Sequence, residues 1–316
     1  MTLLFITATR IGDAVLSTGL LDHWLGTHPG CSVTIACGPL AADLFEAVPG
    51  RERTVVLTKG PYARHWRGLW RTCVGRRWDA IIDLRASAVT WLMRARERHW
   101  LGPDATGAHQ VVRLGRLLGL DPPPAPRLWL GPAHREAGLR LVPPGPPVLA
   151  VAPIANWHAK TWPAERFAAV VRHLTGPTGP LPGGRVAVLG AGSEREAAAP
   201  VLNALPASRC LDLMGQGRLP EIQAALERCA FFVGNDSGLM HMAAAAGLPT
   251  LGLFGPTPET VYGPWGPKAA VVRTPEPAHV LFPPGTDAAR IPAAMNTLDV
   301  GSVITAAEAL WERLAP

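Results

Sequence analysis

The sequence predicts an α/β protein of two Rossmann-like domains, each with a parallel sheet, facing each other across a cleft. Strand-length apolar runs alternate with helical patterns along both halves of the chain, as is typical of parallel sheets. A proline-crowded stretch at residues 121–147 separates the two halves. The length of 316 residues also fits two domains of about 150 residues each.

The N-terminal half alternates strands with helices up to residue 118. Strands are expected at 3–8, 33–36, 54–57 and 80–84, and helices at 14–25, 40–48, 64–73, 87–96 and 110–118. From Asp121 to Pro147 an extended, stiff connection is expected, because proline fixes φ and removes backbone donors. The boundary is placed in its second proline cluster, which gives domains of residues 1–145 and 146–316.

The C-terminal half repeats this alternation. Strands are expected at 148–152, 186–189, 209–212, 231–233, 250–254 and 270–273. Helices are expected at 164–174, 194–204, 219–228 and 239–246, and a last helix at 303–314 follows a loop rich in proline, glycine and alanine.

Composition indicates a well-packed soluble protein, because 48% of the residues are hydrophobic and 17% are charged. No apolar run reaches the roughly 20 residues that span a bilayer, and residues 1–9 fit a first strand and not a signal peptide. Five scattered cysteines and the absence of a His-x-x-x-His pair predict reduced thiols, no metal site and a cytoplasmic location.

The net charge is +6 and the isoelectric point is about 9.5, which implies acidic partners. Nucleic acid, an anionic membrane surface and a phosphorylated substrate all satisfy this charge. The charge alone does not choose among them.

The most informative motif is Gly234-Asn235-Asp236-Ser237-Gly238, between a buried-strand pattern and a helix of small residues. Such a junction points unpaired N–H groups and the positive end of the helix toward a ligand, usually a phosphate. The next strand ends in Gly255-Pro256-Thr257, on the same carboxyl edge, where open α/β sheets bind ligands. An ordinary helix cap at Asp236 or Ser237 is the alternative.

The segment from Gly234 to Pro267 resembles glycosyltransferase family 9, the ADP-heptose:lipopolysaccharide heptosyltransferases. Two further motifs follow the family's order: Arg10-Ile11-Gly12-Asp13 near the start and Lys160-Thr161-Trp162-Pro163 in the middle. The resemblance implies the GT-B fold, an acceptor-binding N-terminal domain and a nucleotide-sugar-binding C-terminal domain. It also implies a last helix that packs back on the N-terminal domain.

In the first motif, Gly12 allows a tight turn and Asp13 stands at a helix N-terminus, where the helix dipole favours a carboxylate. The resemblance implies that Asp13 is the general base that deprotonates the acceptor hydroxyl. A simple N-cap aspartate is the alternative.

In the middle motif, Lys160 precedes a helix and can act as a point charge on a diphosphate. The resemblance implies donor contacts for Lys160, with Asn156 and Thr161 beside it. The family often has small or hydroxyl residues before the lysine, whereas this chain has Ala155-Asn156-Trp157. A solvated lysine is the alternative, and Trp162 is expected to pack between elements of the domain and not to contact the ligand.

Two glycine-rich loops complete the expected donor site. Gly190-Ala191-Gly192-Ser193-Glu194 lacks the third glycine of a dinucleotide fingerprint, because position 195 is arginine. The resemblance implies that Glu194 contacts the ribose of the donor. It implies further that the loop at Met214 and Gly217 meets the adenine, with an ordinary glycine turn as the alternative.

Around the Gly-Asn-Asp-Ser-Gly junction, we expect Asp236 to bind sugar hydroxyls. Ser237 and the N–H groups of Gly238 and Leu239 would hold the phosphates, each hydrogen bond to a charged group contributing about 1.5–3 kcal/mol. His241 is either a phosphate contact, as the resemblance implies, or a buried core histidine.

Basic residues in the N-terminal half form the expected acceptor site. The arginines of the helix at 64–73 share the face opposite an apolar stripe, which is also the pattern of a solvated face. The resemblance implies that this region receives the acidic acceptor. The expected acceptor residues are Arg10, Lys59, Arg64, Arg67, Arg71 and Arg85.

The sequence therefore predicts an inverting, metal-independent transferase without a cofactor that moves heptose from ADP-heptose to a lipopolysaccharide inner-core acceptor. Its partners would be an ADP-sugar, an acidic glycolipid and, by peripheral contact, the cytoplasmic face of the inner membrane, with no nucleic acid. A family 9 transferase using another nucleotide-sugar on another surface glycan is the alternative. A basic nucleic-acid-binding protein, which would interleave basic residues with exposed aromatics in one groove, and a dehydrogenase rank below both.

Overall fold

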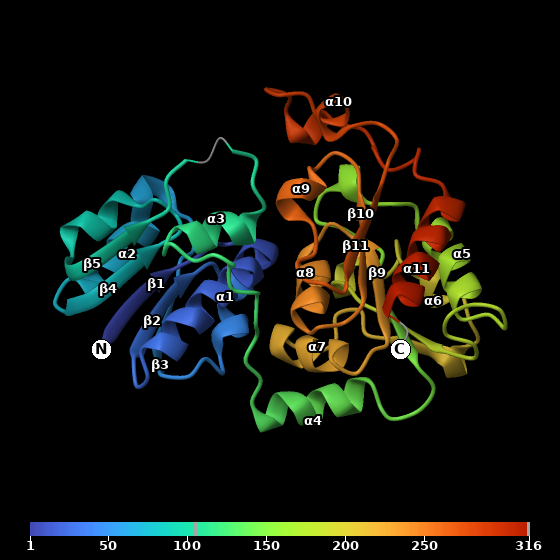
Figure 1. Ribbon diagram of the computed structural model, residues 1–316, viewed down its shortest axis with the longest axis horizontal. Helices are drawn as coiled ribbons and strands as arrows, with labels where there is room; N and C mark the ends of the chain where they lie inside the picture. Colours follow the sequence, from blue (N-terminus) through green and yellow to red (C-terminus); the bar gives the residue numbers. More distant parts are fainter. Residues whose placement is uncertain (104–105, 315–316) are drawn as a thin grey trace. The chain divides into compact units, whose positions relative to one another are not determined.

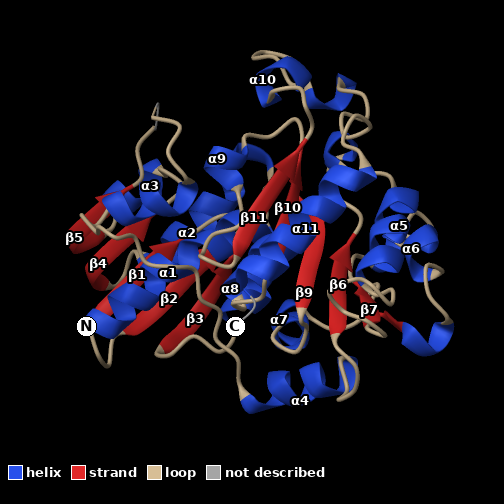
Figure 2. Ribbon diagram, turned by 45° about the vertical axis from the view of Figure 1, so that its right-hand side comes forward, coloured by secondary structure: helices blue, strands red, loops and turns tan. Residues whose placement is uncertain are grey.

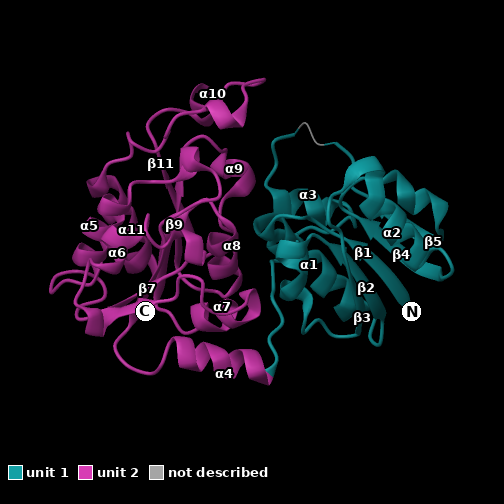
Figure 3. Ribbon diagram, turned by 180° about the vertical axis from the view of Figure 1, so that it is seen from behind, with its two compact units in different colours: residues 1–131 teal, residues 132–316 magenta. Residues whose placement is uncertain are grey.

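The structure is a computed structural model that describes residues 1–103 and 106–314. The chain divides into two compact units, Met1–Gly131 and Pro132–Pro316 (Figure 3). The division precedes the expected boundary because helix α4 (Pro132–Leu141) forms inside the proline-rich stretch. The expectation of an extended connection is therefore wrong for these residues.

Helix α4 belongs to the second unit because it packs closely against α7 (Leu219–Leu226). A Cβ atom on Gly138 would lie 2.6 Å from the Cβ of Ala224, so the two backbones approach as only glycine allows.

The first unit contains a five-stranded sheet in the order β3-β2-β1-β4-β5, with every neighbouring pair parallel (Figure 1). Its strands are β1 (Thr2–Ile6), β2 (Ser32–Cys37), β3 (Arg51–Val56), β4 (Arg77–Asp83) and β5 (Arg94–Trp100). Strand β5 falls partly in the segment expected to be a helix at 87–96. As an edge strand of mostly charged residues it lacks the apolar pattern by which buried strands are recognised.

The helices of the first unit are α1 (Ile11–Thr27), α2 (Arg64–Cys73) and α3 (Gln110–Arg116). Two expected helices are only 3₁₀ segments, η1 (Pro39–Phe45) and η3 (Ala88–Leu92). Leu69 and Cys73 of α2 pack with sheet residues such as Leu4, Ile6 and Ile81, so α2 covers this face of the sheet.

The second unit contains a six-stranded sheet in the order β11-β10-β9-β6-β7-β8, again parallel throughout (Figure 2). Its strands are β6 (Val148–Ala152), β7 (Arg185–Val188), β8 (Cys210–Asp212), β9 (Phe231–Asn235), β10 (Thr250–Phe254) and β11 (Ala269–Arg273). This is the Rossmann strand order, and the first sheet has the same order with one strand fewer. The two parallel α/β domains expected from the sequence are confirmed.

Helices cover both faces of the second sheet. Helices α5 (Ala164–Leu174), α6 (Ala199–Leu202) and α11 (Val300–Leu314) lie on one face, and α7 and α8 (Gly238–Ala245) on the other (Figures 1 and 2). Two short helices, α9 (Glu259–Tyr262) and α10 (Ala278–Leu281), follow β10 and β11. The expected helix at 194–204 is shorter, with α6 preceded by a 3₁₀ turn at Gly192–Glu194.

The last helix is part of the second unit. Its buried residues Val303, Ala307 and Leu310 belong to the same core as Trp162 and Phe167. An amphipathic helix is stabilised where its apolar face is buried, which here is over α5, β10 and β11. The packing on the first domain that the family resemblance implies stays a prediction.

Candidate functional site

The strand order of the second unit defines where a ligand is expected. Strand β6 lies between β9 and β7, and the chain reverses its direction of winding between β6 and β9. Ligands of open α/β sheets bind at such a switch point, beyond the carboxyl ends of the strands. The loops that follow β6 and β9 are the ones that carry the Lys160 and Asp236 motifs.

Lys160 and Asp236 form a buried ion pair at this point. The Nζ of Lys160 lies 2.8 Å from the Oδ2 of Asp236, and their side chains are only 16% and 7% exposed. The hydroxyl of Thr257, in the loop after β10, donates to the same oxygen at 2.8 Å. Three loops of the carboxyl edge therefore meet at one carboxylate oxygen.

Asn235 fixes the two central loops to each other. Its side-chain oxygen accepts a hydrogen bond from the N–H of Trp162 at 3.1 Å, and its amide donates to the carbonyl of Pro153 at 2.8 Å. Trp162 is fully buried, and its indole N–H donates to Leu298 O, so its expected role in packing is confirmed.

Ser237 begins helix α8 and has an extended backbone, with φ −151° and ψ 170°. Its hydroxyl oxygen is buried and has no hydrogen-bond partner among the residues that the structure describes. A buried hydroxyl without a partner costs about 1–3 kcal/mol, and the first N–H groups of a helix also lack internal partners. The junction thus has the unpaired donors that an acceptor-rich group such as a phosphate requires.

Thr161, Asn156 and His241, which are further donor-site candidates, differ in their burial. Thr161 accepts a hydrogen bond from Ala155 N at 3.3 Å, Asn156 is exposed, and His241 is buried in the first turn of α8. The hydrogen bond to Thr161 stabilises the loop after β6.

The glycine-rich loops after β7 and β8 pack on each other. Glu194 accepts a hydrogen bond from the backbone N–H of Ala191 at 2.8 Å, so its carboxylate closes its own loop. The N–H of Gly215 donates to Gly190 O at 2.8 Å, and a Cβ on Gly190 would lie 2.8 Å from the Cε of Met214. Glu194 and Met214 are therefore neighbours, and Gly217, with φ +73°, turns the chain beyond them.

In the first unit, Asp13 is the third residue of α1, and the exposed Arg10 occupies the N-cap position. Asp13 is thus not an N-cap, and Gly12 lies within the helix and not in a turn. A carboxylate in the first turn is favoured by the helix dipole by about 0.3–1 kcal/mol. The position of Asp13 in the first turn is therefore compatible with a structural role and with a catalytic role.

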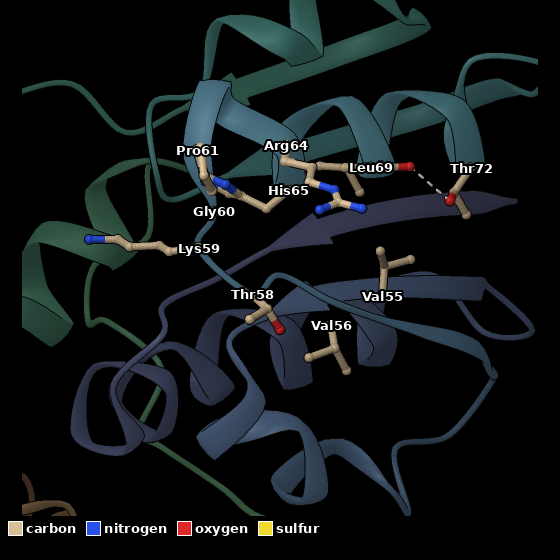
Figure 4. A pocket seen from close by; sticks show the side chains of 11 residues that line it. Val55, Val56, Thr58, Lys59, Gly60, Pro61, Arg64, His65, Leu69 and Thr72 are labelled. Atoms are coloured by element: carbon tan, nitrogen blue, oxygen red, sulfur yellow. Dashed lines mark hydrogen bonds between the residues drawn. The ribbon is translucent and has the colours of Figure 1, made fainter.

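A cavity of about 620 Å³ opens between β3 and α2 in the first unit (Figure 4). Val55, Val56 and Leu69 give it an apolar wall, Lys59 and Arg64 give it positive charge, and His65 lies beside them. Arg67 and Arg71 do not line it, although they share one face of α2 with Arg64. Such a cavity suits a ligand with both sugar and anionic groups.

Arg85 adds to the positive field of this region. Its guanidinium lies 4.9 Å from the ring centroid of Trp66, and burial lowers its pKa. Burial, and then the charges of Arg85 and Lys59, also lower the pKa of His65. Asp83 holds the Arg85 loop by accepting hydrogen bonds from the N–H groups of Arg85 and Ser87, both at 2.9 Å.

Residues 104–282 match the family model of glycosyltransferase family 9 (heptosyltransferase). The chain belongs to this family.

Relatives and solved structures agree with this membership. The chain is 24% identical to lipooligosaccharide heptosyltransferase 2 of Haemophilus influenzae, over 86% of this chain and 88% of the relative. A glycosyl transferase family 9 structure from Veillonella parvula superposes with a TM-score of 0.79 at 19% identity, covering 99% and 97% of the two chains.

The ADP-heptose lps heptosyltransferase II of E. coli gives a TM-score of 0.75 at 19% identity, covering 99% of both chains. These similarities establish the GT-B fold of two parallel-sheet domains for this glycosyltransferase. A further similar structure, the dodecameric TibC of E. coli, is described as iron-containing (TM-score 0.61, 16% identity, 99% and 77% coverage).

In this family 9 chain, the part that the structure describes contains no cluster of three or more His, Cys, Asp or Glu side chains that could hold a metal. The five cysteines are free, and Cys31, Cys37 and Cys73 are buried. No helix within residues 1–103 and 106–314 is long and apolar enough to span a membrane.

The sequence reasoning missed Asn235, Thr257, His65 and Asp83 as parts of these sites. A polar residue at the carboxyl end of a buried strand was the available signal for Asn235 and Asp83. For Thr257 the signal was its place in the loop after the next strand, on the same carboxyl edge. His65 gave no signal, because only folding brings it to the cavity.

Proposed function

We propose that this family 9 glycosyltransferase moves heptose from ADP-heptose to an acidic sugar of the lipopolysaccharide inner core, with inversion at the transferred carbon. The observation that carries the proposal is the junction of Lys160, Asp236 and the buried Ser237 hydroxyl at the switch point of the second sheet. It offers a cation, a hydroxyl and helix N–H groups to a diphosphate. The names of the relatives, which include lipooligosaccharide, ADP-heptose and lps, support the choice of substrates.

In the proposed reaction the acceptor hydroxyl attacks C1 of the heptose from the face opposite the ADP. Asp13 takes the proton of that hydroxyl as general base. The C1–O bond to the diphosphate breaks, and Lys160, Ser237 and the N–H groups of Gly238 and Leu239 stabilise the leaving ADP. Asn156, Thr161, Glu194, Met214, Gly217 and His241 would complete the donor site, with Asp236 positioning Lys160.

The acceptor would bind in the first unit. The cavity with Lys59 and Arg64 provides cations for phosphate or carboxylate groups, and Arg85 and Arg10 would extend this positive region. The reaction would take place at the cytoplasmic face of the inner membrane, which would anchor the acceptor, with the enzyme in peripheral contact.

Incubation of purified protein with ADP-heptose and a deacylated inner-core acceptor, followed by mass spectrometry, tests the proposal. We expect a product heavier by one heptosyl residue, no product from UDP-sugars, and unchanged turnover with a chelator present. Transfer from another nucleotide-sugar and not from ADP-heptose would contradict the proposed donor. Loss of turnover with the chelator, restored by one metal, would contradict metal independence.

A further inference from the structure

Two adjacent side chains of the first unit are unusually exposed for their type. Trp91 and Leu92, at the end of η3, have exposed fractions of 63% and 68%. Single exposed apolar residues are common on proteins, but adjacent large ones are typical of interaction surfaces.

The exposure belongs to a well-fixed turn. Arg98 of β5 donates hydrogen bonds to the carbonyls of Thr90 at 3.1 Å and Met93 at 2.9 Å, on either side of these two residues. Its guanidinium also lies 4.8 Å from the ring centroid of Trp91. Arg98 therefore holds the turn in place while Trp91 and Leu92 remain in contact with water.

Positive charge is concentrated in the same unit. The first unit has 16 Lys and Arg residues against 10 Asp and Glu, whereas the second has 14 of each, so the whole net charge of +6 lies in the first unit. Arg94 and Arg96 are exposed on the edge strand β5, directly after the turn.

Helix α2 extends this positive charge, because it packs against η3 and exposes Arg67 and Arg71. Strand β5 contains one acidic residue, Glu97, whose carboxylate lies 3.8 Å from His99 Nε2.

We propose that Trp91 and Leu92, together with Arg94, Arg96, Arg67 and Arg71, dock this protein on an anionic lipid bilayer; we refer to these residues as the Trp91 surface. Tryptophan favours the level of the lipid headgroups, leucine enters the acyl region, and arginines pair with headgroup phosphates. The inference rests on the proposed function in one respect, since a glycolipid acceptor lies in such a bilayer.

Other occupants fit the surface less well. A second copy pairing along β5 would bring arginines against arginines, which repel. A single-stranded nucleic acid would use aromatic rings in a positively charged groove, whereas Trp91 and Leu92 do not line the cavity at Lys59 and Arg64. The more exposed of the two residues is moreover the aliphatic Leu92, which offers no ring for stacking.

Co-sedimentation of the full-length protein with vesicles of phosphatidylglycerol and phosphatidylethanolamine in equal parts tests the proposal, with phosphatidylcholine vesicles as reference. We expect W91S/L92S to weaken vesicle binding roughly tenfold or more, and R94Q/R96Q to weaken it roughly 30-fold at low salt. The matched controls are V280S, an exposed apolar residue of α10, and R172Q/R290Q, two exposed arginines of the second unit. Both control variants should bind the vesicles as tightly as the parent protein does.

Three results would overturn the proposal. The first is equal vesicle binding by W91S/L92S, R94Q/R96Q and the controls. The second is a dimer of the parent in sedimentation equilibrium that W91S/L92S abolishes. The third is tighter binding of a uridine homopolymer than of vesicles, lost in the same variants.

Activity on a deacylated acceptor separates this proposal from the proposed function. Both surface variants should keep the parent's kcat/KM with that acceptor, because none of the four substituted residues contacts a reacting group. Failure of heptosyl transfer would contradict the proposed function but not the docking on a bilayer. Failure of vesicle binding would contradict the docking but not the proposed function.

Discussion

The ammonium of Lys160 and the carboxylate of Asp236 lie 2.8 Å apart, and this contact joins the loops after β6 and β9 at the centre of the second sheet. The sequence assigned the two residues to different parts of the donor, the lysine to the diphosphate and the aspartate to the sugar. In the structure they form one unit. Asp236 also accepts a hydrogen bond from the hydroxyl of Thr257. It therefore positions Lys160, the cation that we propose for the diphosphate.

Lys160→Met should weaken ADP binding roughly 10- to 100-fold, because a charge-assisted contact to the diphosphate is lost. It should also lower the free energy of unfolding by about 3 kcal/mol, since the buried Asp236 loses its counter-charge. Calorimetry with ADP and denaturant titration measure the two effects. Lys268→Met, at an exposed lysine of the same unit, is the control. If Lys160→Met binds ADP as tightly as the control does, Lys160 does not contact the diphosphate.

Ser237→Ala should weaken the binding of ADP without lowering the stability of the fold. The buried hydroxyl has no partner among the described residues, so its removal should leave the unfolding midpoint unchanged or raise it slightly. ADP affinity should fall roughly tenfold or more, because the donor to the phosphate is gone. A large loss of stability with unchanged ADP affinity would make Ser237 a structural cap.

Asp13→Asn should lower kcat roughly 10²–10⁴-fold, the usual range for general-base catalysis, and leave ADP affinity unchanged. Steady-state kinetics with a deacylated acceptor measures this change. Asp22→Asn, on the same helix α1, is the control for a lost carboxylate. If Asp13→Asn retains the kcat of this control, Asp13 only stabilises the first turn of the helix.

Arg64→Gln should raise the KM for a deacylated acceptor roughly tenfold, because Arg64 lines the cavity in which we propose that it binds an acidic group of the acceptor. Arg67→Gln/Arg71→Gln should change this KM by no more than about twofold. The KM should depend less on salt concentration in this double variant, because two charges are lost. Kinetics at low and high salt compare the variants. If the double variant raises the KM more than Arg64→Gln does, the acceptor binds along the whole arginine face of α2, as the sequence suggested.

His65 should make stability depend on pH. Its pKa in the folded protein is lowered from the ordinary value of 6.5 by burial and by the charges of Arg85 and Lys59, so the unfolded state binds the proton more readily. Stability is therefore lost as pH falls below 6.5 and is unaffected by this group above it. His65→Gln should remove that loss. Thermal unfolding of both proteins across this range would show parallel curves if His65 has no such role.

Most of the fold could be read from the sequence because buried parallel strands are continuous apolar runs. The strands β6, β9 and β10 are buried at every residue, and each was expected with nearly its observed bounds. Helices α2 and α5 were expected with the bounds they have, since their apolar residues recur at helical spacing.

The errors occurred where long-range packing decides the local structure. Strand β5 has charged residues along most of its length and is a strand because it pairs with β4. Helix α4 forms between proline clusters because α7 offers a complementary surface at Ala224. Neither partner is visible in the local sequence.

The sequence by itself determined the family, the two parallel sheets and the loops that carry the site, since strand periodicity, helix caps and motif order are local properties of the chain. Only the tertiary structure decided that Lys160 pairs with Asp236, that Arg64 alone of its row lines the cavity, and that Trp91 remains exposed beside Arg98. These contacts join residues from separate loops and strands. Their geometry follows from strand order and packing, which a linear pattern does not encode.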